Sequence, residues 1–195
     1  MTKIVHGQLA RWHGARSWAE GALARARAPQ SRQGQLGIYL NDHLAGATGG
    51  MELARRMAGS HHDPAQQMTL QRLAVEITHD RRALLDLMAA LGLPVRHYKF
   101  SAAWAAEKAA RLKLNGRLLS RSPLSSLEEL EMLRLGVEGK AAGWRTLRAL
   151  ADADSRLDRD RLDELMARAR QQADQLEKLR VQTAAHLIEA EPGTA

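Results

Sequence analysis

The stretch DPAQQMTLQRLAVEITHDRRALLDLMAALGLP, residues 63–94, carries a full set of helix signals. Asp63 is a good N-cap, and Pro64 suits the first helical position because the N–H that it lacks would have no partner there. Gly92 and Pro94 stop the helix after its last periodic residue. Inward positions recur every three or four residues, as on one face of an α-helix: Leu70, Leu73, Ile77, Asp80, Leu84, Leu87 and Leu91. We therefore expect a helix over 64–91.

The same period extends through the rest of the chain and predicts four more helices. Valine is sparse and strand-like alternation is absent. The further expected helices cover residues 32–58, 97–118, 123–153 and 158–189. Short connections between long helices imply antiparallel neighbours. We therefore expect an all-α fold, an antiparallel four-helix bundle with a long C-terminal fifth helix.

This reading divides the chain into three parts. Residues 1–31 form a basic N-terminal extension, residues 32–153 the bundle, and residues 154–195 the C-terminal helix and tail. The narrow apolar stripe of the last helix suits either packing along its own bundle or a coiled-coil seam between subunits. The second alternative, or contact through the bundle itself, would make the protein a homo-oligomer.

The positive charge of the chain is concentrated at its N-terminus. Lys and Arg number 29 against 22 Asp and Glu, a net charge of +7, and residues 1–35 carry +5 of it. A nucleic-acid-binding domain spreads basic residues along a docking face, so the nearly neutral body disfavours one. The alternative is a tether in which the basic arm, with Trp12 and Trp18, holds nucleic acid or anionic lipid.

Several function classes are excluded or disfavoured by composition and motif. The absence of cysteine excludes disulfides, iron–sulfur clusters, thiolate zinc sites and cysteine nucleophiles. The sequence has no apolar run long enough to span a membrane and no secretory signal, so we expect a cytoplasmic protein. Nucleotide-binding and common hydrolase motifs are also missing from the sequence. The excess of Arg over Lys and the abundance of Ala are typical of a bacterial genome rich in G and C.

One spacing indicates metal chemistry. Glu76 and His79 form an E-x-x-H pair, and residues three apart on a helix face the same way, so the two side chains can share a metal. Acidic residues on the other expected helices complete a candidate iron or manganese site, whose ligands would be Asp42, His43, Glu76, His79, Glu107 and Glu138. Over residues 36–152 this pattern resembles the ferritin-like family of carboxylate four-helix bundles.

Three longer stretches also resemble uncharacterised bacterial proteins of ferritin-like fold. They are YLNDHLAGATGG (39–50), AAWAAEKAARLKLNGRLLSRSPLSSLEELE (102–131) and LGVEGK (135–140). The resemblance implies the helical bundle, and it implies no activity, substrate or catalytic residue.

Other features argue against a dinuclear metal site. Glu138 is followed three residues later by Ala141, so the second E-x-x-H is missing. Counted from the turn at Asp63, Asp42 and Glu76 differ in level by 8 residues, or about 12 Å along the axis, whereas paired metals lie about 3.5–4 Å apart. The cations Lys108, Arg111 and Lys140 also fall on or beside the inward stripes.

A polar core layer fits the same residues better. His43 and Asp80 differ in level by 3 residues, about 4–5 Å, so we expect them to be in contact. The other expected members of the layer are Glu76, Glu107, Lys108, Glu138 and Lys140. Salt bridges among them would replace metal ligands and fix the helix register.

These features favour a non-catalytic bundle without a cofactor. Such a protein would bind a partner protein, another copy of itself, or a small ligand between its helices. The alternative is a dinuclear iron or manganese protein that acts in oxidoreduction or metal storage.

Overall fold

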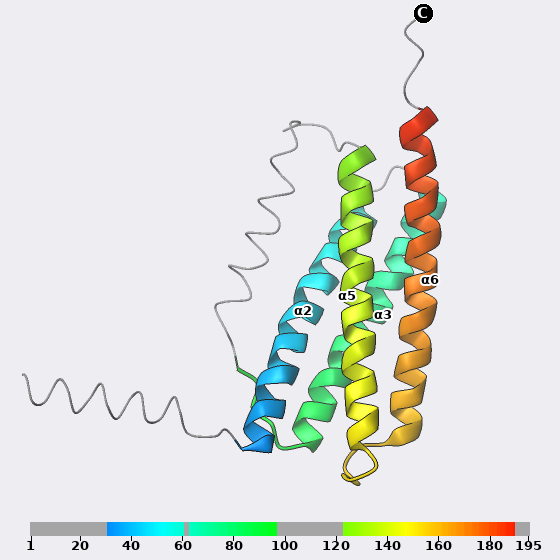
Figure 1. Ribbon diagram of the computed structural model, residues 1–195. Helices are drawn as coiled ribbons and strands as arrows, with labels where there is room; N and C mark the ends of the chain where they lie inside the picture. Colours follow the sequence, from blue (N-terminus) through cyan, green and yellow to red (C-terminus); the bar gives the residue numbers. More distant parts are fainter. Residues whose placement is uncertain (1–30, 61–62, 97–122, 190–195) are drawn as a thin grey trace, which may run out of the picture. The chain divides into compact units, whose positions relative to one another are not determined.

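A computed structural model of the protein describes residues 31–60, 63–96 and 123–189 (Figure 1). The chain divides into two compact units, Met1–Leu36 and Gly37–Ala195. The described part of the first unit is the opening turn of a helix, where Ser31 Oγ accepts a hydrogen bond from Gly34 N at 3.1 Å. The other described residues belong to the second unit.

The described residues form four helices and no strand, which confirms the all-α prediction. The helices are α2 (Arg32–Ser60), α3 (Pro64–Ala90), α5 (Pro123–Leu150) and α6 (Arg159–Glu189). Each bound lies within three residues of the expected one. The expected helix over 97–118 and the extension over 1–31 lie outside the described residues. None of the described helices is long and apolar enough to cross a membrane.

Both ends of α3 have the expected local chemistry. The Asp63 carboxylate accepts hydrogen bonds from the backbone N–H groups of Ala65 at 2.8 Å and Gln66 at 3.4 Å, two donors that a helix start leaves free. Gly92 has a φ of +68°, and its N–H donates to Ala89 O at 3.0 Å. A glycine in the left-handed region is the usual way to end a helix, so α3 stops here.

The helices run alongside one another (Figure 1), and specific contacts give their order. Tyr39 near the start of α2 contacts Thr146 near the end of α5, and Arg56 contacts Glu129 in the first half of α5. α2 and α5 are therefore antiparallel neighbours. α5 and α6 pack closely against each other. All four helices contribute side chains that are almost fully buried: Leu40, Met57, Leu70, Leu73, Met88, Leu130, Leu133, Leu147, Leu162 and Leu176.

Candidate functional site

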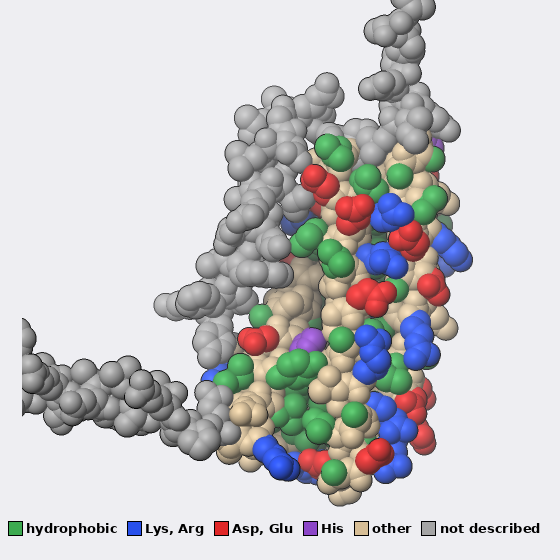
Figure 2. Space-filling model, viewed as in Figure 1, with side chains coloured by type: hydrophobic (Ala, Val, Ile, Leu, Met, Phe, Trp, Pro, Cys, Tyr) green, Lys and Arg blue, Asp and Glu red, His purple; other side chains and the backbone are tan. Residues whose placement is uncertain are grey.

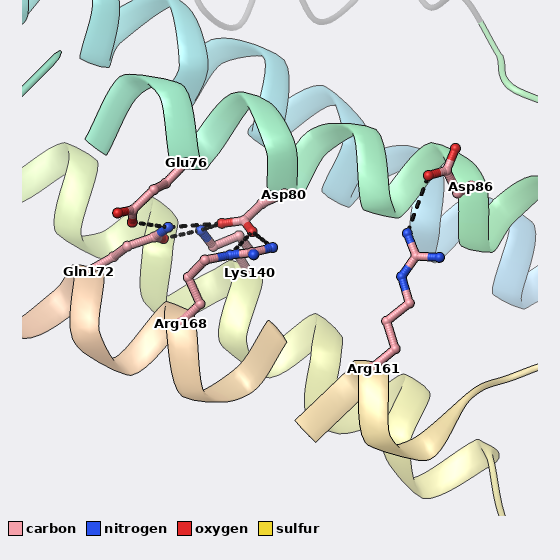
Figure 3. Close-up of polar contacts among 7 residues, drawn as sticks. All are labelled: Glu76, Asp80, Asp86, Lys140, Arg161, Arg168 and Gln172. Carbon is pink, nitrogen blue, oxygen red and sulfur yellow. Dashed lines mark hydrogen bonds and ion pairs between the residues drawn. The ribbon is translucent and has the colours of Figure 1, made fainter. Parts of the chain in front are cut away.

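A group of polar and charged residues lies between α3, α5 and α6 (Figure 3). Asp80 on α3 is only 1% exposed. Its Oδ2 accepts a hydrogen bond from Lys140 Nζ on α5 at 2.5 Å, and its Oδ1 accepts from Arg168 Nε on α6 at 2.7 Å. One buried carboxylate therefore joins three helices through two cations.

Gln172 completes the group by filling the space between the charges. Its side chain is fully buried, and its Nε2 donates to Glu76 Oε2 at 3.0 Å and to Asp80 Oδ2 at 3.1 Å. Its Oε1 accepts a hydrogen bond from Lys140. We call Glu76, Asp80, Lys140, Arg168 and Gln172 the charged cluster. With two acids and two bases, its formal charge is zero.

The members of the charged cluster are hydrogen-bonded to one another. Burial lowers the pKa of Lys140, and the neighbouring Asp80 carboxylate opposes that shift. Each acid of the cluster accepts at least one hydrogen bond from another member. Such networks fix how helices pack more than they add to stability. The cluster is therefore suited to holding α3, α5 and α6 in register.

The structure joins part of the polar layer expected from the sequence. Asp80 and Lys140 are in direct contact, and Glu76 is linked to them through Gln172. Asp80 pairs with α5 and α6 rather than with His43, as we had expected, because its two oxygens accept hydrogen bonds from Lys140 and Arg168. His43 lies on α2 against Gly143, where a Cβ would come within 3.2 Å of its ring.

Of the three other members of the expected layer, one is exposed and two lie outside the described residues. Glu138 is exposed, because it follows the buried Val137 by one residue and so points about 100° away on the helix. Glu107 and Lys108 lie outside the described residues.

Arg168 and Gln172 belong to the charged cluster although the sequence analysis did not select them. A signal for them exists: they lie one helical turn apart on α6, next to the buried Leu165, Ala169 and Ala173. Polar residues four apart on the edge of an apolar stripe share one face of a helix.

The described members of the candidate metal site do not converge. Asp42, His79 and Glu138 are exposed, and Glu76 is engaged by Gln172. Within the described ranges, no three side chains of the kinds that bind metals come together. The described candidates therefore do not form a metal-binding group among themselves. The sixth candidate, Glu107, lies outside those ranges.

A hollow of about 350 Å³ lies between α2, α3 and α5. Figure 2 shows hydrophobic side chains gathered along it. Its apolar lining comes from α2, α3 and α5: Leu40, Ala47, Ile77, Leu84, Leu133, Val137, Trp144 and Leu147. We call this hollow the α2–α5 groove. Asp80 and Lys140 of the charged cluster also line it, so the two features are adjacent.

Glycines leave unused room in the α2–α5 groove. A Cβ at Gly46 or Gly50 on α2, or at Gly136 or Gly139 on α5, would meet no atom of the described residues within 4 Å. All four glycines line the groove. A glycine inside a helix costs about 0.5–1 kcal/mol relative to alanine, and nothing in the described part of the chain uses the space that these glycines leave.

Few polar groups face the α2–α5 groove. The ring of His43 packs edge-on against Tyr39, with 4.5 Å between the ring centroids, and burial lowers the pKa of His43. The Tyr39 hydroxyl is hydrogen-bonded to Thr146 at 3.0 Å. Trp144 is 2% exposed, and its indole N–H has no hydrogen-bond partner among the described residues. The groove is thus mostly apolar, with the half-buried His43 imidazole at its side.

Comparison with known proteins gives no family for this chain. No protein-family model, curated protein or solved structure matches it.

Proposed function

We propose that this chain is a non-catalytic binding protein of ferritin-like bundle fold, and that the α2–α5 groove is its binding surface. The observation that carries the proposal is the groove itself, an apolar hollow of about 350 Å³ in which four glycines leave room. Binding sites are typically mostly apolar concavities of this size with a few placed polar groups.

The charged cluster supports binding rather than catalysis. General acid–base or metal chemistry needs a carboxylate, imidazole or amine that can reach a substrate or ion. In the cluster, Asp80 is held by two cations and Glu76 by Gln172. These groups are occupied in holding the helices together.

Elemental analysis tests the non-catalytic half of the proposal. Protein purified without a histidine tag is expected to contain iron and manganese well below one ion per chain. Stoichiometric iron or manganese that is lost on Glu76→Ala would overturn the proposal in favour of a carboxylate metal protein.

Two leucine substitutions test the groove as a binding surface. If Gly50 or Gly139 faces a guest of any kind, leucine will clash with it and lower stability by about 1–3 kcal/mol. If the groove holds only water, the better helix propensity of leucine will raise stability by up to about 1 kcal/mol. Thermal melting of Gly50→Leu and Gly139→Leu separates the two, and a rise in Tm for both contradicts the proposal.

Gly59→Leu is the matched control for these variants. Gly59 also lies on α2, and a Cβ there meets no described atom within 4 Å. It lines a separate hollow between α2 and α3. We expect Gly59→Leu to leave the Tm unchanged or raised, so a general intolerance of leucine on α2 would show itself.

A further inference from the structure

We infer that the α2–α5 groove binds a small molecule with a linear hydrocarbon body and one cationic head, as in an alkylamine, and that Asp42 pairs with the head. The inference rests on the proposed function, because it names the ligand class of that groove. Three observations support it: the shape of the groove, the place of its unpaired charge, and the engagement of the base that lines it.

The α2–α5 groove is long and narrow. Its lining runs from Tyr39 to Gly50 on α2 and from Leu133 to Leu147 on α5, a length of about 16–21 Å. A volume of about 350 Å³ spread over that length leaves a cross-section of about 20 Å², or about 5 Å across. A helix of a partner protein measures about 10–12 Å across with its side chains. The groove therefore fits a single extended hydrocarbon chain better than a helix.

The lining of the groove favours a hydrocarbon chain over a polar ligand. Its walls are mostly leucine, isoleucine, valine and alanine side chains, and the glycines at Gly46, Gly50, Gly136 and Gly139 keep it open. Each methylene group that leaves water for such a lining is worth about fourfold in affinity. The chain of the ligand therefore supplies most of the affinity.

Asp42 places a negative charge near one end of the groove. It lines the groove close to Tyr39, and it makes no hydrogen bond or ion pair with any residue that the structure describes. Asp80 and Lys140 also line the groove, but their charges are paired with each other. The charge left over at the groove is therefore that of Asp42, which complements a cationic head.

An anionic head finds no free base there. Among the described residues that line the groove, Lys140 is the one base, and its Nζ donates to Asp80 and Gln172. Burial lowers the pKa of His43, which disfavours a positive charge on its imidazole. A carboxylate at this end would also be repelled by Asp42. The groove therefore selects an amine over a fatty acid of the same length.

The exposure of Asp42 sets the size of this preference. The side chain is in contact with water, so an ammonium group beside it keeps much of its hydration and loses little on binding. An exposed ion pair of this kind is worth about 1.5- to fivefold in affinity. The charge thus decides selectivity and the hydrocarbon chain decides affinity.

Calorimetric titration with three probes of one chain length tests the inference. We expect octylamine to bind one molecule per chain, 1-octanol to bind about threefold more weakly, and octanoate about tenfold more weakly. The net charge of the protein is +7, so unspecific attraction would favour octanoate instead. Butylamine is expected to bind at least tenfold more weakly than octylamine, because fewer methylene groups are buried.

Asp42→Asn separates the charge from the groove. We expect it to bring the affinities for the three octyl probes within about 1.5-fold of one another. Glu52→Gln is the matched control, because Glu52 is an exposed acid on the same helix that does not line the groove. It is expected to leave the order of the probes unchanged. A preference for octylamine that survives Asp42→Asn, or tightest binding of octanoate, would overturn the inference.

The leucine variants show where the probe binds. Gly50→Leu and Gly139→Leu narrow the groove, so each is expected to weaken octylamine binding at least tenfold and to remove the rise in Tm that octylamine gives the unmodified protein. Octylamine binding that neither variant weakens lies elsewhere on the protein and would overturn the inference.

The failure of this inference and that of the proposed function are distinguishable. If the three octyl probes bind equally and Gly50→Leu abolishes their binding, the groove binds without regard to charge and only the inference fails. If no probe binds and both leucine substitutions lower the Tm, the groove has a guest of another chemistry, and again only the inference fails. If no probe binds and both substitutions raise the Tm, the proposed function fails as well.

Discussion

Asp80 and Lys140 lie 60 residues apart in the sequence, yet a 2.5 Å contact between Asp80 Oδ2 and Lys140 Nζ joins α3 to α5. Their side chains are only 1% and 12% exposed. Arg168 approaches the other carboxylate oxygen from α6, so the pair is part of a neutral cluster. A pair withdrawn from water is costly to break from one side, because the remaining charge is left without compensation.

Asp80→Ala is therefore expected to lower the free energy of unfolding by about 3–5 kcal/mol. The substitution leaves Lys140 in a buried position without its carboxylate, and Gln172 loses one acceptor. Urea unfolding followed by circular dichroism measures the loss. Asp86→Ala on the same helix is the control, because Asp86 is 41% exposed and pairs with Arg161 at 3.3 Å (Figure 3). It is expected to cost at most about 1 kcal/mol.

Replacing both partners is expected to be milder than replacing one. In Asp80→Leu combined with Lys140→Met, no buried charge of the pair remains, and Arg168, which is 36% exposed, can turn to solvent. Apolar replacements of buried ion pairs are often close to neutral. The double variant should therefore be more stable than Asp80→Ala. The single substitutions Asp80→Leu and Lys140→Met are measured beside the double variant. If the stability lost by the double variant equals the sum of the two single losses, as for independent sites, the residues do not act as a pair.

Asn41 is expected to be the polar residue of α2 that matters most for stability. It is 5% exposed, and its amide contacts Gly37 O, Pro94 O and Arg96 N. Asn41→Ala removes these three hydrogen bonds of a buried amide, which costs about 1–3 kcal/mol. The neighbouring Asp42 is exposed, so Asp42→Ala should change stability by no more than about 0.5 kcal/mol. Equal melting temperatures for the two variants would contradict this role of Asn41.

The helices could be predicted from the sequence because their signals are local. Asp63, Pro64 and Gly92 act within a few residues of their own positions, and the apolar period needs only one helix. The same counting placed Asp80 and Lys140 in a polar layer. It did not find Arg168 or Gln172, because the rotation of α6 relative to α3 depends on all the packed side chains.

The expected contact between His43 and Asp80 shows the same limit of prediction from the sequence. Counting residues from the turn gives the height of a side chain along the helices. It does not give the direction in which the side chain points. His43 and Asp80 line the same groove, as their heights suggest, but the Asp80 oxygens are directed to α5 and α6.

Gly92→Ala and Gly59→Ala are expected to change stability in opposite directions. Gly92 has a φ of +68°, and a residue with a Cβ pays roughly 1–2 kcal/mol in that region. Gly59 is helical, and its Cβ would meet no described atom within 4 Å, so alanine should stabilise it by up to about 1 kcal/mol. Thermal melts of the two variants decide the point. A stabilised Gly92→Ala would mean that the turn after α3 does not need the left-handed conformation.

His43 is expected to make the protein less stable in acid. Burial lowers its pKa below the ordinary value of 6.5, and the nearby Asp42 opposes the shift only in part. Between the lowered value and 6.5 the unfolded chain binds more protons than the folded one, so stability falls as the pH falls through that window. Above pH 6.5 the contribution of His43 is fully present.

Comparison of three proteins across pH tests this expectation. His43→Gln removes the titrating group and should flatten the fall in Tm below pH 6.5 relative to the unmodified protein. His79→Gln, at an exposed position of α3, should leave the fall unchanged. If His43→Gln and the unmodified protein lose Tm in parallel, His43 is not held neutral by the groove. Its burial would then have no consequence for stability, and the imidazole would be open to solvent as His79 is.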